Sequence, residues 1–154
     1  ILYARQFKLS LNMSSEQTIK FEIATPERVV YKNQIRQATL PSVDGDITVL
    51  PNHIPLITLL KPGVAMLKLP DGQVEYLAIQ GGFVEVSVNK IVVLADTAEM
   101  ASEIDDQAVA AARSQAEQIM AAQAENTPEF IEARAHLVAE ILRLKAVDLQ
   151  RHRR

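Results

Sequence analysis

The chain has 154 residues, 48% of them apolar and 23% charged, which suits one ordinary globular domain or two small ones. This composition excludes a mainly disordered protein, and the net charge of −3 excludes a general attraction to nucleic acid or anionic lipid. The absence of cysteine excludes disulfides and thiol nucleophiles, and no apolar run approaches the roughly 18 residues of a membrane-spanning helix.

The first segment of the chain is interpreted as an extension outside the fold. The chain begins with Ile, and the twelve residues before Met13 lack the apolar stretch and the cleavage site of a signal peptide. Residues 1–17 are therefore predicted to be an N-terminal extension of upstream or non-native sequence.

The composition changes sharply near Asp96. Residues 1–94 contain all five Gly and six of the seven Pro, whereas residues 95–154 contain fifteen Ala. Turn formers between β-branched residues are typical of strands, and Ala is typical of helices. The sequence therefore predicts a strand-rich domain at 18–97 and a helical domain at 98–154.

The strand-rich domain contains apolar stretches separated by turn residues. Ile19, Phe21 and Ile23 point to one side of a half-buried strand, while the polar residues between them point to the other. Three hairpins are predicted after it, at 35–50, 64–79 and 84–95. Short strands at this spacing predict an antiparallel β-sandwich, and a nucleotide-binding βαβ unit is excluded because no strand alternates with a helix.

Two helices are predicted in the second domain. The first begins at 102–105, where acids suit a helix N-terminus, and runs to about Ala122 with a mostly alanine apolar stripe. The second begins after Thr127, a strong N-cap followed by Pro128, and runs to about Gln150. The chain is therefore predicted to have an α+β fold in two domains, an N-terminal antiparallel β-sandwich followed by a C-terminal antiparallel α-helical hairpin.

Three segments resemble a known family. They are ITVLPNHIPLITLLKPGV from Ile47 to Val64, AIQGGFVEV from Ala78 to Val86, and VLADTAE from Val93 to Glu99. Their order and spacing are similar to those of the epsilon subunit of F-type ATP synthases, the equivalent of the mitochondrial delta subunit. The resemblance covers about residues 18–150.

The resemblance implies a non-catalytic subunit in the central stalk of a rotary, proton-translocating enzyme. The sandwich would bind the gamma subunit and sit on the membrane-embedded c-ring. In bacterial and chloroplast members the hairpin can open, reach the catalytic alpha and beta subunits and block ATP hydrolysis. The implied location is peripheral, on the cytoplasmic face of the bacterial inner membrane, with an organelle inner or thylakoid membrane as the alternative.

The dimensions of the hairpin are compatible with such a movement. Extended helices of roughly 18 and 23 residues, at about 1.5 Å per residue, would span about 60 Å. An alanine seam buries little apolar surface, and each missing buried CH₂ forgoes roughly 0.8 kcal/mol. We therefore expect the hairpin to be docked weakly enough for a partner to shift its position.

Charge is divided along the hairpin. Residues 96–125 contain seven acids and one base, whereas residues 143–154 contain five bases and one acid. Because bases on this helix face acids of the beta subunits in the family, the resemblance assigns an inhibitory contact to Arg143, Lys145 and Arg151. The alternative is that these bases complement the helix C-terminus and stay solvated. We expect no nucleic-acid partner, because the basic segment is short and the protein acidic.

The resemblance also implies a contact with the rotor ring. Asp46 matches an acidic family position that faces the polar loop of the c subunits, and His53 matches a histidine in the next loop. Taken alone, Asp46 is an ordinary turn acid and His53 a structural or solvated loop histidine, so both interpretations stay open.

Some bacterial members bind ATP through an Ile/Leu-Asp-x-x-Arg-Ala motif at the start of the first helix. Ile104 and Asp105 match the beginning of this motif, but Ala108 and Val109 replace its Arg and Ala. Because the missing guanidinium would be a natural phosphate partner, we predict weak or absent ATP binding and no cofactor.

No catalytic or metal-binding constellation is evident in the sequence. Asp105 and Asp106 are successive residues that complement a helix dipole, and the three histidines lack the spacing of a shared metal site. Gly81-Gly82 lacks the Lys-Ser/Thr pair of a phosphate loop, so it predicts close strand packing instead. We therefore expect a non-catalytic subunit, and the alternative is a free-standing β-sandwich binding module with a helical oligomerisation tail.

Overall fold

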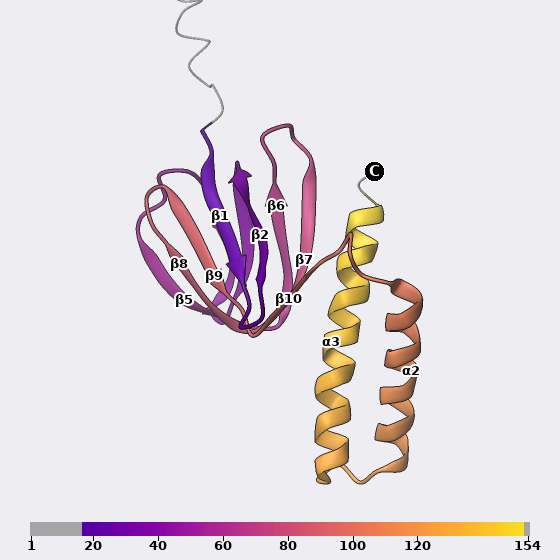
Figure 1. Cartoon of the computed structure of the whole chain (residues 1–154). Helices are drawn as coiled ribbons and strands as arrows, with labels where there is room; N and C mark the ends of the chain where they lie inside the picture. The colour runs from indigo at the N-terminus through magenta and orange to yellow at the C-terminus, as the bar shows by residue number, and fades with distance from the viewer. Residues whose placement is uncertain (1–16, 153–154) are drawn as a thin grey trace, which may run out of the picture.

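The computed structural model describes residues 17–152 and has two parts, a β-domain and a pair of helices (Figure 1). Ten strands form a sandwich that is nearly closed into a barrel, and the two helices form an antiparallel hairpin at its side. This arrangement confirms the predicted fold class. The predicted extension at 1–17 lies outside the described residues, except for Gln17.

The strands are β1 (Ile19–Ala24), β2 (Val29–Ile35), β3 (Gln37–Ser42), β4 (Gly45–Val49), β5 (Leu56–Leu60), β6 (Gly63–Lys68), β7 (Val74–Gln80), β8 (Gly82–Val86), β9 (Lys90–Leu94) and β10 (Thr97–Met100), and the helices are α2 (Asp106–Ala122) and α3 (Pro128–Arg151). The three predicted hairpins are β3–β4, β6–β7 and β8–β9. Sequence patterns miss β2, β5 and β10. Strand β2 is mostly polar toward its end, β5 has apolar residues on both faces, and β10 is very short.

The strand order is β10-β7-β6-β3-β5-β8-β9-β1-β2, with β4 beside β3. Neighbouring strands are antiparallel except for β1 and β9, which run parallel with Phe21 opposite Ile91. The antiparallel sandwich therefore contains one parallel pair, which local hairpin signals do not indicate because the two strands are so distant in sequence. Strand β10 pairs with β7 as far as Met100, three residues beyond the predicted end of the first domain.

The core of the sandwich is formed by residues that alternate along the strands and point inward. Ile19, Phe21 and Ile23 are fully buried, as their spacing predicts. The ring of Phe21 lies 6.2 Å from that of Tyr31 on β2. Burial, together with a hydrogen bond to Glu75, raises the pKa of Tyr31 to about 12, so this residue is a neutral phenol.

Two consecutive glycines allow β8 to approach β9 closely. Gly81 and Gly82 have φ angles of +74° and +109°, values that L-residues rarely adopt. A Cβ atom on Gly82 would lie 2.2 Å from the carbonyl oxygen of Leu94 and 2.7 Å from the Cα of Ala95. The predicted close packing of strands at this position is confirmed.

The helical hairpin packs on the outer face of β6 and β7 through α3, while α2 lies on the far side of α3 (Figure 1). A second apolar cluster joins it to the sandwich through Tyr76, Ala78, Val109, Ala146 and Val147. The only buried side chains described in α2 are Val109 and Ala116, so the seam between the helices is made of small residues, as predicted.

Candidate interaction surfaces

The two residues predicted to contact the rotor ring lie at opposite ends of one strand. Asp46 is the second residue of β4, exposed and opposite Pro41 of β3. His53 lies in the 50–55 segment that follows the other end of β4. The structure therefore does not bring Asp46 and His53 together into a single site.

The segment that carries His53 is held in place by backbone contacts. Asn52 adopts a φ of +64°, and its N–H donates to the carbonyl of Val88 at 3.3 Å. The half-buried ring of His53 donates from Nδ1 to the carbonyl of Ile54 at 2.7 Å. The neighbouring Ile54 side chain is 75% exposed, so this segment presents an apolar tip to solvent.

An exposed apolar ladder crosses the outer face of the sandwich, and sequence reasoning missed it. We define it as Ile57 and Leu59 on β5, Phe83 on β8 and Leu94 on β9, which are all between 42% and 72% exposed. Leu59 lies opposite Phe83, which in turn lies opposite Leu94. Contiguous exposed apolar side chains of this kind mark protein interaction surfaces. The sequence signal for it is in β5, where Ile57 and Leu59 are apolar on the face opposite to the inward-pointing Leu60.

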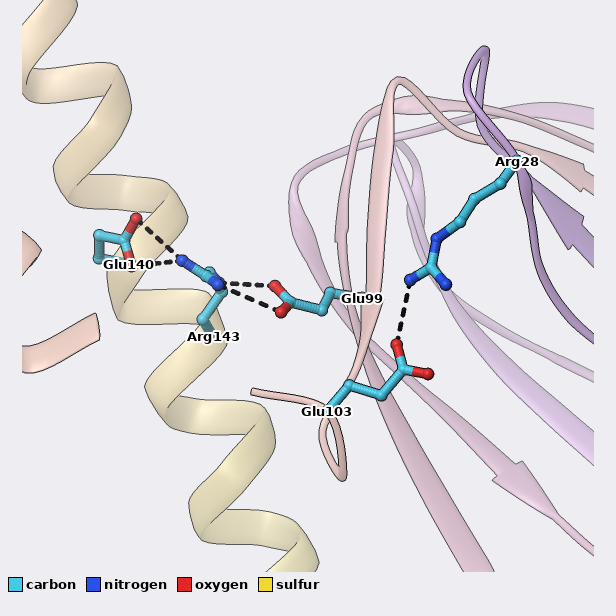
Figure 2. A network of polar contacts seen from close by, with 5 residues as sticks. All are labelled: Arg28, Glu99, Glu103, Glu140 and Arg143. Atoms are coloured by element: carbon cyan, nitrogen blue, oxygen red, sulfur yellow. Dashed lines mark hydrogen bonds and ion pairs between the residues drawn. The ribbon is translucent and has the colours of Figure 1, made fainter. Parts of the chain in front are cut away.

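The predicted contact residue Arg143 is engaged with two carboxylates of the same chain (Figure 2). Its Nε and one terminal nitrogen donate to Glu99 on β10 at 2.8 and 3.2 Å, and its other terminal nitrogen donates to Glu140 at 3.0 Å. The Glu99 bonds are bidentate and link the helix to the sandwich. The sequence signal for Glu140, which is only 8% exposed, is its position between apolar residues of the helix.

These ion pairs keep Arg143 charged in a partly buried position. Burial alone would lower its pKa, but the hydrogen bond and charge of Glu99, together with Glu140, raise the pKa above its ordinary value. The side chains of Arg143 and Glu99 are 28% and 30% exposed, so solvent screens this pair only partly. A groove of about 570 Å³ lies beside it, between α3, β10 and the turn at 25–28.

The other two predicted contact residues differ from each other. Arg151 donates to Asp106 at 2.7 Å and thereby joins the end of α3 to the start of α2. This bond lowers the pKa of Asp106. The ion pair therefore stabilises the folded chain at pH values above the ordinary pKa of Asp, and this stabilisation is lost as the pH falls through the lowered pKa. Lys145 is exposed, and no ion pair is seen for it among residues 17–152.

A second ion pair connects the sandwich to the link before α2. Arg28, in the turn between β1 and β2, donates to Glu103 at 3.1 Å (Figure 2). Both side chains are about half exposed, so the pair contributes little to stability. Sequence reasoning identified neither residue.

The partial nucleotide-binding motif has structural roles in this fold. Ile104 is buried in the apolar cluster between the hairpin and the sandwich. The carboxylate of Asp105 is the N-cap of α2 and accepts from the N–H groups of Gln107 and Ala108 at 3.0 and 3.3 Å. Both residues that match the motif therefore already have contacts within the chain.

We expect Asp105→Ala to lower the free energy of unfolding by about 1 kcal/mol, because the first turn of α2 loses its acceptor. Chemical denaturation followed by circular dichroism would measure the change. Asp105→Asn keeps a capping oxygen and should stay within about 0.5 kcal/mol of the unmodified chain. An equal loss in both variants would contradict a capping role.

The described part of the chain contains no group of metal-ligating side chains. Neither α2 nor α3 is apolar enough over a sufficient length to span a membrane, and no other helix occurs in the described residues. The surfaces described above consist of an apolar ladder, an exposed turn acid and partly buried ion pairs.

Comparison with known proteins gives a consistent result. The family model described as ATP synthase, Delta/Epsilon chain, beta-sandwich domain, matches residues 18–101. The ATP synthase epsilon chain of Herpetosiphon aurantiacus is 41% identical over 135 residues, which cover 88% of this chain and 98% of that relative. The epsilon chain of Nitrosococcus oceani is 36% identical over 131 residues, which cover 85% and 93%.

The fold also occurs in a solved assembly. A chain in the cryo-EM structure of the Euglena gracilis mitochondrial ATP synthase, OSCP/F1/c-ring, superposes with a TM-score of 0.71 at 20% identity and covers 85% of this chain and 81% of that chain. The family match, the relatives and the shared fold agree: this chain belongs to the family of ATP synthase epsilon chains.

Proposed function

We propose that this chain is a non-catalytic rotor subunit in the central stalk of a proton-translocating F-type ATP synthase. In this role it couples the gamma subunit to the c-ring and inhibits ATP hydrolysis through its C-terminal helices. It is peripheral, on the cytoplasmic face of the bacterial inner membrane. The observation that carries the proposal is the hairpin, which is held on the sandwich by a small apolar cluster and by the pairing of Arg143 with Glu99, while Arg151 pairs with Asp106 of α2.

The apolar ladder supports a contact with the gamma subunit. Its four side chains form a surface that a stable partner would remove from water, and burial of such side chains contributes roughly 25 cal/mol per Å². The ladder lies on β5, β8 and β9, away from α3, which packs on β6 and β7. The hairpin can therefore move while the sandwich stays bound.

The opposite ends of β4 support a contact with the c-ring. Asp46 offers an exposed carboxylate on a tight turn, suited to a basic or amide-bearing loop. The segment at 50–55 offers the exposed Ile54 beside His53. We propose that both residues contact the ring, Asp46 through the turn at the start of β4 and His53 through the 50–55 segment that follows its end.

Release of the hairpin would exchange internal partners for external ones. Arg143 leaves Glu99 and Arg151 leaves Asp106, and with Lys145 these bases face acids on the beta subunits. The basic residues of α3 then have acidic partners in both the folded and the extended form. Such an exchange keeps the difference in free energy between the two forms small enough for partners to shift their populations.

The test is ATP hydrolysis by a catalytic subcomplex that lacks this subunit. It would be titrated with the full chain and with a chain that ends at Ala101, which retains β10. We expect both to bind the gamma subunit and only the full chain to slow turnover. If both chains bind but neither inhibits, only the coupling role remains. If neither chain binds, the free-standing binding module is favoured.

A further inference from the structure

Strand β7 is longer than its neighbour β10, so the backbone groups at one end of β7 have no partner strand on that side. The last pair between the two strands is Met100 with Leu77. Ala101 adds one further bond, from its N–H to the carbonyl of Tyr76 at 2.9 Å. The chain then turns away, with the N–H of Glu103 donating to Met100, so no strand covers the N–H of Tyr76 or the carbonyl of Val74.

The side chain of Gln150 on α3 occupies this place. Its Oε1 accepts from the N–H of Tyr76 at 3.1 Å, and its Nε2 donates to the carbonyl of Val74 at 3.2 Å. A carboxamide has the same donor and acceptor as a peptide group. Gln150 therefore continues the ladder of β7 by one rung where the strand β10 has ended.

We propose that this pair of hydrogen bonds, the Gln150 clamp, is the latch that holds the hairpin in its folded position. An apolar contact such as that of Ala146 and Val147 tolerates sliding and rotation, because it is non-directional. The clamp is directional and is satisfied only at one height and one rotation of α3. Its loss leaves two partly buried backbone groups without a partner, which is costly.

The chemistry of the site restricts which side chain can form the clamp. A carboxylate cannot donate to the carbonyl of Val74, and an ammonium group cannot accept from Tyr76. The charged groups nearby are Glu75 on β7, which lies in the lining of the adjoining cavity, and the Arg151–Asp106 pair of the two helices. A protonated Glu at position 150, however, would offer the same donor and acceptor as Gln.

This relation gives a test in the full chain. Hydrogen exchange of the α3 amides, corrected for the intrinsic rate at each pH, reports release of the hairpin even when it is rare. We expect Gln150→Ala to raise the ratio of released to docked hairpin about tenfold, because two hydrogen bonds are lost. The matched control, Gln118→Ala on the exposed side of α2, should leave the ratio unchanged.

Gln150→Glu separates a hydrogen-bonded latch from simple packing. At pH 8 the carboxylate should release the hairpin at least as much as Gln150→Ala does. At pH 5 protonation should restore docking toward the level of the unmodified chain measured at the same pH, whereas Gln150→Ala should show no such recovery. Normal docking of Gln150→Ala, or the same pH response in both variants, would overturn the proposal.

The consequence for regulation rests on the proposed function. A released hairpin should make Gln150→Ala inhibit ATP hydrolysis at lower concentrations than the unmodified subunit. If hydrogen exchange shows release but hydrolysis is unaffected, the clamp stands and the inhibitory role of the hairpin fails. If the unmodified subunit inhibits and Gln150→Ala neither releases the hairpin nor changes inhibition, the clamp fails and the proposed function stands.

Discussion

Gly82→Ala is expected to reduce the free energy of unfolding by roughly 3–5 kcal/mol. The new Cβ would lie 2.2 Å from the carbonyl oxygen of Leu94, which is backbone and cannot rotate away. The residue also adopts a φ of +109°, where an L side chain is strained. The expected loss combines this backbone strain with the displacement of β9 from β8. Urea denaturation followed by circular dichroism would measure it.

Gly72→Ala is the matched control for this substitution. Gly72 also has a positive φ, +88°, but no atom lies within 4 Å of the position that its Cβ would take. Only the strain of a positive φ applies at Gly72, so we expect the free energy of unfolding to fall by about 1 kcal/mol. Equal losses at Gly82 and Gly72 would contradict the role of strand packing at Gly82.

Glu99→Gln is expected to weaken docking of the hairpin by about 1–2 kcal/mol. Arg143 would lose the charged acceptor of its two bonds to the sandwich, at 2.8 and 3.2 Å, while its bonds to Glu140 on the same helix stay. Hydrogen exchange of the α3 amides would measure the change. If the hairpin inhibits hydrolysis, the same variant should inhibit at lower concentration.

Glu103→Gln provides the comparison for this ion pair. Glu103 and Arg28 form the other bridge from the sandwich toward the helices, but their side chains are 48% and 56% exposed. Because solvent screens such a pair, we expect docking to change by less than about 0.5 kcal/mol. Equal effects of Glu99→Gln and Glu103→Gln would show that the Arg143 bonds carry no special share of docking.

The parts of the fold that depend on neighbouring residues could be predicted from the sequence. Alternation places Ile19, Phe21 and Ile23 in the core, and Thr127 and Pro128 begin α3 where capping preferences put them. The parallel pairing of β1 with β9 could not be predicted, because each strand has the same local pattern whichever partner it has. Strand β10 was hidden by its length, since four residues show no clear periodicity.

The interaction surfaces could be predicted less well from the sequence, because they depend on contacts between distant elements. The family resemblance predicts a contact with another subunit for Arg143, and the structure gives this residue an internal partner, Glu99, 44 positions earlier. Gln150 carries no charge and follows no motif, so its hydrogen bonds to β7 become evident only when the structure places α3 at the edge of that strand. The apolar ladder became visible only when pairing set Leu59, Phe83 and Leu94 side by side.

The parallel pair of β1 and β9 also bears on how the chain is made. During synthesis β1 emerges early, but β9 begins at Lys90, 66 residues after β1 ends at Ala24. At about 5–20 residues per second, the ribosome needs roughly 3–13 s to supply that partner. For this time the apolar side of β1, with Ile19, Phe21 and Ile23, has only β2 beside it. The nascent chain is therefore most in need of chaperone protection before β9 has been made, and the helices are added after the sandwich is able to close.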